Sequence, residues 1–318
     1  MTELAWPVRA RRWYPSPSRA SPRAPEVSGK LTPYLLILPA LIVLLLTVAF
    51  PLAYSLYHSF FYYLLFRPAD MRWVGFGNYL HLLNDSSFWM SVRLSLIFTG
   101  VGVGLEVLIG ILVALLMRGD FTGSTVCRLL LMTPMLMSPV VTGMTWRFLY
   151  SPDNGLINAA LRLVGVPAPQ WLTSPSTALL GVIIADIWQW TPFVFLVVYA
   201  GLQNVPRDLL EAAQLDGAGY WRSLQSITMP MLKPVLAVVI LIRLIDSIKT
   251  FDLVYVMTWG GPGTSTFLLS INNWSIGFSA FQIGRGAAFS YLVLLVITVL
   301  TTYRSKLMQG RSVRRVVA

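Results

Sequence analysis

Ionisable residues within long apolar segments are the feature of this sequence best placed to do chemistry. Arg243, Asp246 and Lys249 follow one another at intervals of three residues, which places them near one face of a helix. Glu106 stands alone in an earlier apolar run. A charged side chain at the centre of a bilayer costs about 2.5 to 3.5 kcal/mol on insertion scales. We therefore expect these residues to form an intramembrane polar network that either pairs helices or shapes a pathway.

A second polar group forms a stripe along another predicted helix, at positions i, i+3, i+4 and i+7: Asp186, Gln189, Trp190 and Phe193. A carboxylate and an amide beside aromatic rings suit a carbohydrate, which presents hydroxyls at its edges and C–H groups on its faces. Packing between helices explains the same stripe equally well. Both interpretations remain open at the level of sequence.

The sequence lacks the residue patterns of common catalytic sites. His58 and His81 do not stand in HExxH or any other helical metal-ligand spacing, and neither GxSxG nor GxxxxGK[ST] occurs. We therefore expect no catalytic residue and no metal site, and Cys127 alone cannot form an internal disulfide. If the protein drives active transport, its energy must come from another subunit or from an ion gradient.

Composition indicates a protein with several membrane spans. Of 318 residues, 56% are hydrophobic and 12% are charged, against roughly 25% charged in an average soluble domain. The formal net charge of +11 is concentrated at the two ends of the chain. Such clusters set membrane topology, and no aromatic-interleaved basic face points to nucleic acid.

A span needs about 20 largely apolar residues, and the sequence predicts an all-α protein with six such helices. They are Tyr34 to Tyr57, Val92 to Met117, Arg128 to Leu149, Ala178 to Leu202, Val235 to Thr258 and Ala287 to Tyr303. The basic tails and the basic loops 118–128 and 207–233 then share the cytoplasmic side. Residues 1–30 are a Pro/Arg-rich tail expected to be disordered, 31–305 form the membrane domain, and 306–318 form a basic tail.

The loop 203–234 is the most informative segment. Its apolar spacing predicts a short helix that Gly217 and Gly219 end, and a second helix from Tyr220 to Ile227 before Pro230. Two short helices with small residues at their junction suit docking in a groove on a partner, because small side chains permit close backbone approach.

Eight residues of this loop resemble the EAA loop of ABC importer permeases: Glu211, Ala212, Ala213, Asp216, Gly217, Ala218, Ile227 and Pro230. The resemblance implies that the loop inserts into a cleft on an ATP-binding subunit and couples ATPase closure to the membrane helices. Leu224 stands where Phe is frequent in that family, and the apolar character is kept.

Two further patterns are similar to the maltose-permease group of that family. One comprises Arg128, Pro134, Trp146, Pro152, Gly155, Ile157 and Asn158, and the other Arg243, Asp246, Phe251, Asp252, Tyr255, Thr258 and the sequence GGP at 260–262. They imply a carbohydrate-type solute: a sugar, oligosaccharide, polyol or glycerophospho compound. Matching positions imply a substrate pathway of Asp186, Gln189, Trp190, Phe193, Asp246, Ser247 and Thr250.

The resemblance also implies the assembly. A second homologous permease, in a heterodimer, would complete the pathway, and two ATP-binding subunits would carry ATP and Mg, leaving no cofactor in this chain. An extracytoplasmic substrate-binding protein would deliver the solute to this multi-pass protein of a prokaryotic inner membrane, which would work by alternating access.

Three rival functions remain. An ion-coupled secondary transporter would use an intramembrane carboxylate such as Glu106 or Asp246, but it leaves the 211–230 pattern unexplained. A membrane-embedded enzyme lacks a nucleophile-base or metal constellation. An ABC permease for a polyamine or phosphate would keep the machinery and change the solute.

Overall fold

The computed structural model describes residues 32–119 and 121–313, so the predicted tail 1–30 and residues 314–318 lie outside the described chain. The chain divides into two compact units between Ala53 and Tyr54. The first unit contains α1 (Thr32–Leu44), a π-helical segment (Leu45–Ala49) and the start of α2 (Phe50–Ser59). Tyr34–Ser59 forms an apolar helical run of 26 residues, long enough to cross a bilayer.

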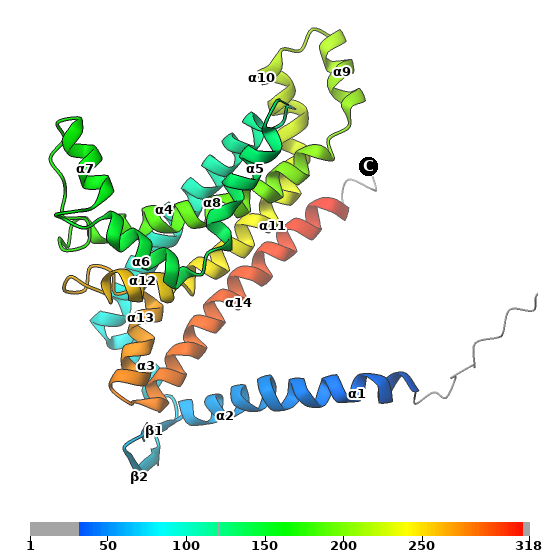
Figure 1. Cartoon of the computed structure of the whole chain (residues 1–318). Helices are drawn as coiled ribbons and strands as arrows, with labels where there is room; N and C mark the ends of the chain where they lie inside the picture. Colours follow the sequence, from blue (N-terminus) through cyan, green and yellow to red (C-terminus); the bar gives the residue numbers. More distant parts are fainter. Residues whose placement is uncertain (1–31, 120, 314–318) are drawn as a thin grey trace, which may run out of the picture. The chain divides into compact units, whose positions relative to one another are not determined.

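The second unit is built around three helices, α4 (Ser86–Leu116), α8 (Ala178–Gln203) and α11 (Met229–Ile248) (Figure 1). α4 and α8 approach closely at Gly110, where a Cβ would lie 2.6 Å from Cγ1 of Val194. The small residue is needed there because membrane helices associate by tight packing. Both helices are long and apolar enough to be spans.

The third predicted span is broken. α5 (Ser124–Met132) continues into a 3-10 segment (Thr133–Leu136), and α6 (Pro139–Leu149) then leaves at an angle of 100°. Ser138 caps α6 by accepting a hydrogen bond from the Val141 N–H at 3.3 Å, and Pro139 occupies the first helical position. Residues 128–149 were predicted as a single helix and instead form two, because a capping serine followed by proline starts a new helix.

The fifth predicted span is also discontinuous. α11 ends at Ile248, and α12 (Asp252–Thr258) begins after a three-residue break at 249–251. The Thr250 carbonyl at the break accepts a hydrogen bond from the Ser270 hydroxyl of α13 (Leu269–Trp274). A partner outside the helix thus satisfies a backbone group that the break exposes.

The described residues contain three helices long and apolar enough to cross a membrane, or four if the bent α5–α6 pair is one span. The sixth predicted span falls within α14 (Ile283–Val313), whose apolar part is Ile283–Val299. The remaining helices are short: α3 (Gly77–Asn84), α7 (Leu156–Leu163) and the π-helical Ser275–Ser279.

The described residues are mostly helical, as predicted, and a β-hairpin is an element that the prediction omitted. β1 (Phe61–Leu64) pairs antiparallel with β2 (Arg67–Trp73), with Phe61 opposite Trp73. The Leu65 N–H donates to the Phe281 carbonyl, which ties the hairpin to the segment before α14. Aromatic side chains favour a strand here, and the turn lacks the Asn-Gly or Asp-Gly signal by which hairpins are usually recognised.

The ends of the central bundle carry different structures. α9 (Arg207–Leu215) and α10 (Tyr220–Ser223) lie at one end, and α6, α7 and α12 lie at the other (Figure 1). α8 connects the two ends with 26 residues, which span about 39 Å at 1.5 Å per residue.

Candidate functional site

The helical protrusion after α8 has a well-defined tip. α9 ends in a Schellman motif, in which the Ala218 N–H donates to the Ala213 carbonyl at 2.8 Å and the Gly217 N–H to the Gln214 carbonyl at 3.0 Å. Gly217 has φ +79°, a conformation that glycine adopts without a Cβ penalty. The predicted short helix and its glycine stop are therefore both present.

The tip is exposed and partly apolar. Leu215 is 91% exposed and Trp221 70% exposed, so the tip presents two large apolar side chains that a partner could cover. Glu211, Ala212, Asp216 and Gly217 are exposed, and Ala213, Ala218, Ile227 and Pro230 are half-buried. The structure thus gathers these residues around one protruding turn and the helix that follows it.

The second helix of the protrusion does not stop before Pro230 as predicted. α10 passes through a π-helical segment (Leu224–Thr228) directly into α11. The π-helical pattern just before Pro230 removes the need for the regular helical hydrogen bond that proline cannot donate. One helical run therefore joins the tip to the central bundle.

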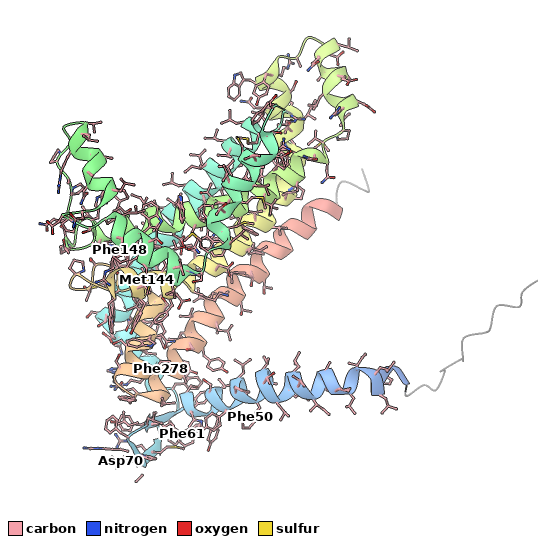
Figure 2. The ribbon with its side chains drawn as sticks, viewed as in Figure 1. Phe50, Phe61, Asp70, Met144, Phe148 and Phe278 are labelled. Atoms are coloured by element: carbon pink, nitrogen blue, oxygen red, sulfur yellow. The ribbon has the colours of Figure 1, made fainter. Side chains whose placement is uncertain are left out.

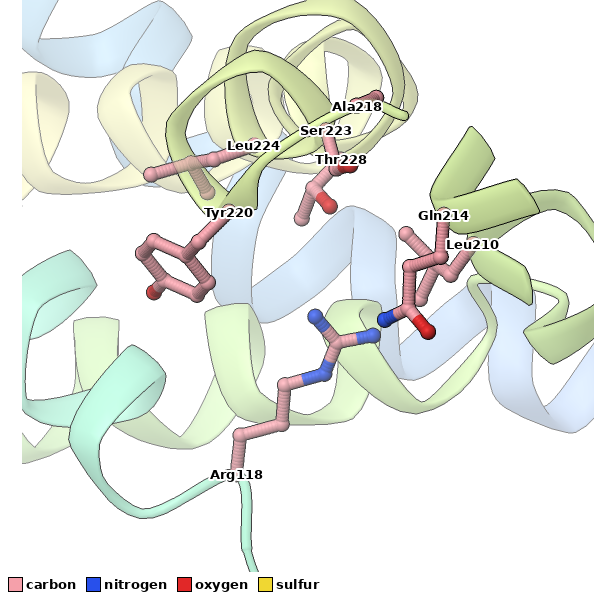
Figure 3. Close-up of a pocket in the computed structure, with 8 residues that line it drawn as sticks. All are labelled: Arg118, Leu210, Gln214, Ala218, Tyr220, Ser223, Leu224 and Thr228. Atoms are coloured by element: carbon pink, nitrogen blue, oxygen red, sulfur yellow. The ribbon is translucent and has the colours of Figure 1, made fainter. Parts of the chain in front are cut away.

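A small pocket of about 190 Å³ lies beneath the tip, lined by Leu210 and Gln214 of α9, by Tyr220 of α10 and by Leu224, among others. Figure 3 shows the Arg118 side chain, from the end of α4, reaching toward the Gln214 amide. The pocket is smaller than the roughly 300 Å³ at which ligand sites begin, and it is of the size that admits single side chains.

A buried ion-pair network joins the three central helices. Arg243 of α11 donates from Nε to Glu106 Oε2 of α4 at 2.7 Å and from Nη2 to Glu106 Oε1 at 2.9 Å. Its Nη2 also lies 3.2 Å from Asp186 Oδ2 of α8. All three residues are at most 1% exposed. A bidentate guanidinium–carboxylate pair fixes orientation as well as distance, so this contact sets how the helices pack.

Trp190 and Ser247 extend this network. The guanidinium carbon of Arg243 lies 4.6 Å from the centre of the Trp190 ring, a cation–π contact. One turn further along α11, the Ser247 hydroxyl donates to Thr99 Oγ1 of α4 at 3.0 Å. Asp186 Oδ1 is buried and has no hydrogen-bond partner among the described residues.

The residues that the sequence analysis placed together in a polar network and in a polar stripe lie at several separate positions in the structure. Asp246 and Lys249 pair with each other at 3.7 Å on an exposed part of the α11 end, apart from Arg243. Gln189 donates to the Met137 carbonyl at 2.9 Å, so this amide satisfies the backbone at the α5–α6 bend. Trp190, Phe193 and Thr250, the last at the α11 break, are half-buried.

The sequence analysis did not identify Thr99 as a member of this network. The available signal was its position seven residues before Glu106, on the same face of one predicted helix.

His58 is buried and hydrogen-bonds the Tyr54 carbonyl through Nδ1 at 2.8 Å, which gives it a structural role in the fold. Long apolar helices around a buried ionic junction, with a protruding helical tip at one end, indicate an α-helical membrane protein.

The family assignment is direct. Residues 87–317 match the model of the family described as "Binding-protein-dependent transport system inner membrane component", and the chain belongs to this family. A probable ABC transporter permease protein, y4oQ of Sinorhizobium fredii, is 38% identical over 280 residues, covering 87% of this chain and 90% of the relative. The chain is therefore a permease subunit of an ABC transporter, and ATP hydrolysis belongs to separate subunits.

Further relatives have named solutes. The trehalose/maltose permease protein MalF of Thermococcus litoralis is 38% identical over 267 residues, covering 83% of this chain and 89% of the relative. The trehalose permease protein SugA of Mycobacterium tuberculosis is 34% identical, covering 84% and 85%. A chain of a bacterial alginate ABC importer has the same fold, with a TM-score of 0.77, 22% identity and coverage of 87% and 94%.

Proposed function

We propose that this chain is half of the translocation path of a carbohydrate importer: a sugar, oligosaccharide, polyol or glycerophospho compound enters by alternating access. The main support for the proposed coupling is the exposed α9–α10 tip. α10 is continuous with α11, and α11 holds Arg243 of the buried ion-pair network. Relatives that are named for trehalose and maltose support the solute class.

The tip would seat in a cleft of an ATP-binding subunit, with Glu211, Asp216 and Gly217 at the contact. Two such subunits would bind ATP and Mg, and this chain would hold neither. A second homologous permease, in a heterodimer, would complete the path. A substrate-binding protein would dock at the opposite end, consistent with a solved alginate importer in complex with its "alginate pentasaccharide-bound periplasmic protein".

The proposed topology has six spans and both termini in the cytoplasm. It counts the bent α5–α6 pair, the interrupted α11–α12 pair and the apolar part of α14 as one span each, beside the three long apolar helices. Basic residues Arg118, Arg128 and Arg207 then lie on the cytoplasmic side, as the positive-inside rule requires.

Purification of the assembled transporter from native membranes tests the whole proposal. We expect two copies of an ATP-binding subunit, a second permease and a carbohydrate delivered by the binding protein, identified by mass spectrometry. Uptake that an uncoupler abolishes and that is indifferent to ATP would instead establish an ion-coupled carrier.

Trp190→Ala tests the pathway. We expect uptake of the solute to fall about three- to tenfold, because the variant loses an aromatic face worth roughly 0.5 to 1.5 kcal/mol beside the path. The ATP-binding subunits should still co-purify, since Trp190 lies in the middle of α8, about 20 Å before the end that leads to the tip. Trp190→Phe is the matched control and should keep most of the uptake. Unchanged solute kinetics in the alanine variant would assign Trp190 to helix packing.

A further inference from the structure

A second concave site lies at the end of the bundle opposite the coupling tip. It is a groove of about 870 Å³ between the end of α6, the segment before α8, and α12 with the turn that follows it. This volume lies within the range of small-molecule sites, roughly 300 to 1,000 Å³. We call it the outer groove, defined by Arg147, Phe148, Tyr150, Trp171, Tyr255 and Trp259.

One wall of the outer groove is held rigid. Trp171 stacks on Tyr150 with ring centres 4.9 Å apart, and its indole N–H donates to Asn158 Oδ1 at 2.9 Å. The Tyr150 hydroxyl in turn donates to the Gly181 carbonyl at 3.2 Å. Met144 and Phe148, labelled in Figure 2, follow one turn apart on α6 and are exposed. Tyr150 is buried and supports the half-buried Trp171 from behind, so Trp171 offers a preformed surface.

The opposite wall ends in an unusual tryptophan. Trp259 has φ +53°, a conformation rare for a bulky residue and usually given to glycine after a helix. Its side chain is nevertheless 64% exposed, and its ring centre lies 4.7 Å from that of Tyr255. Its ring centre also lies 6.4 Å from that of Trp274, so two aromatic rings hold Trp259 in place while its exposed part is open at the groove.

The polar groups of the groove suit hydroxyls. Of the described residues that line it, Arg147 alone is charged, and its one hydrogen bond goes to the Val256 carbonyl at 3.3 Å. Its remaining N–H donors, with the hydroxyls of Ser151 and Thr173 at the groove, can meet the oxygen atoms of a sugar while the rings meet its C–H faces.

We propose that the outer groove is a saccharide-binding vestibule, which captures the solute as it leaves the binding protein and before it enters the membrane path. This inference rests on the proposed function, because the far end of α8, about 39 Å from the end that leads to the tip, is external only if the tip is cytoplasmic. A captured solute cannot diffuse away, so the vestibule raises the number of solute molecules moved per ATP.

Trp259→Ala in the complete transporter, reconstituted in proteoliposomes with its own binding protein, tests the vestibule. The probes are trehalose, maltose, maltotriose and an alginate trisaccharide. We expect the ratio of saccharide transported to ATP hydrolysed to fall about three- to tenfold, the effect of losing one stacked ring, while Trp259→Phe keeps most of it. The binding-protein concentration that half-saturates the ATPase should not change.

Trp73→Ala is the matched control, because Trp73 is 62% exposed and lies on the hairpin outside the groove. An equal loss in Trp73→Ala would overturn the vestibule in favour of interfacial anchoring. A raised half-saturating concentration of binding protein would make the groove a protein contact instead. An unchanged ratio in Trp259→Ala, with normal wild-type transport of at least one probe, rejects the vestibule alone, whereas wild-type uptake that an uncoupler abolishes and that is indifferent to ATP rejects the proposed function as well.

Discussion

Gly217→Asp is expected to leave the protein inserted in the membrane while uptake falls by about 5- to 150-fold, the span of typical coupling free energies between two sites. Gly217 sits at the exposed tip, where a Cβ would meet no atom of the described chain within 4 Å. The substitution therefore creates no clash within the permease, and aspartate tolerates positive φ better than most residues. The added bulk and negative charge would act on whatever docks there.

The measurement is ATP hydrolysis and solute uptake in the same proteoliposomes, with the amount of permease determined by immunoblot. We expect hydrolysis to lose its dependence on the binding protein. Gly123→Asp is a matched control: Gly123 has φ +88° and open space around its Cβ position, and it lies in the 118–128 loop outside the EAA residues. Normal uptake by Gly217→Asp at normal expression would count decisively against docking at this tip.

The helical tip was predictable because its signals are local. A short apolar pattern, a glycine stop and small residues fall within a dozen positions, and α9 with its Schellman motif follows from them. The bend in the third span was also locally encoded, because Ser138–Pro139 is a helix start. A search for long apolar segments does not detect this bend, because segment length and hydropathy contain no information about helix direction.

The ion-pair network was only partly predictable. Insertion cost predicts that Glu106 and Arg243 need partners, but they are 137 residues apart, so spacing could not join them. Helical periodicity instead suggested that Arg243, Asp246 and Lys249 lie together on one face of a helix. The structure turns Arg243 inward to two carboxylates and leaves the other two residues exposed, because positions three apart differ by about 60° around a helix.

Arg243→Met should be the most damaging substitution for folding. It removes the cation shared by Glu106 and Asp186, so two carboxyl groups at most 1% exposed lose their partner. Removal of one partner from a buried ion pair costs about 3 to 5 kcal/mol of folding free energy, because the remaining charge stays buried without a partner. We expect little protein in the membrane fraction and a strongly lowered thermal stability of the detergent-solubilised remainder.

Two further variants distinguish the effect of an unpaired buried charge from the effect of replacing a long basic side chain by methionine. Lys249→Met breaks the exposed pair with Asp246 on the same helix and should change stability by less than about 0.5 kcal/mol. Adding Glu106→Gln and Asp186→Asn to Arg243→Met removes all the charges and should recover most of the lost stability, because neutral groups of similar volume carry a far smaller desolvation cost. If Arg243→Met alone were as stable as wild type, the junction of α4, α8 and α11 would not depend on this network. Recovery of stability without recovery of uptake would show that the same charges also serve the transport cycle.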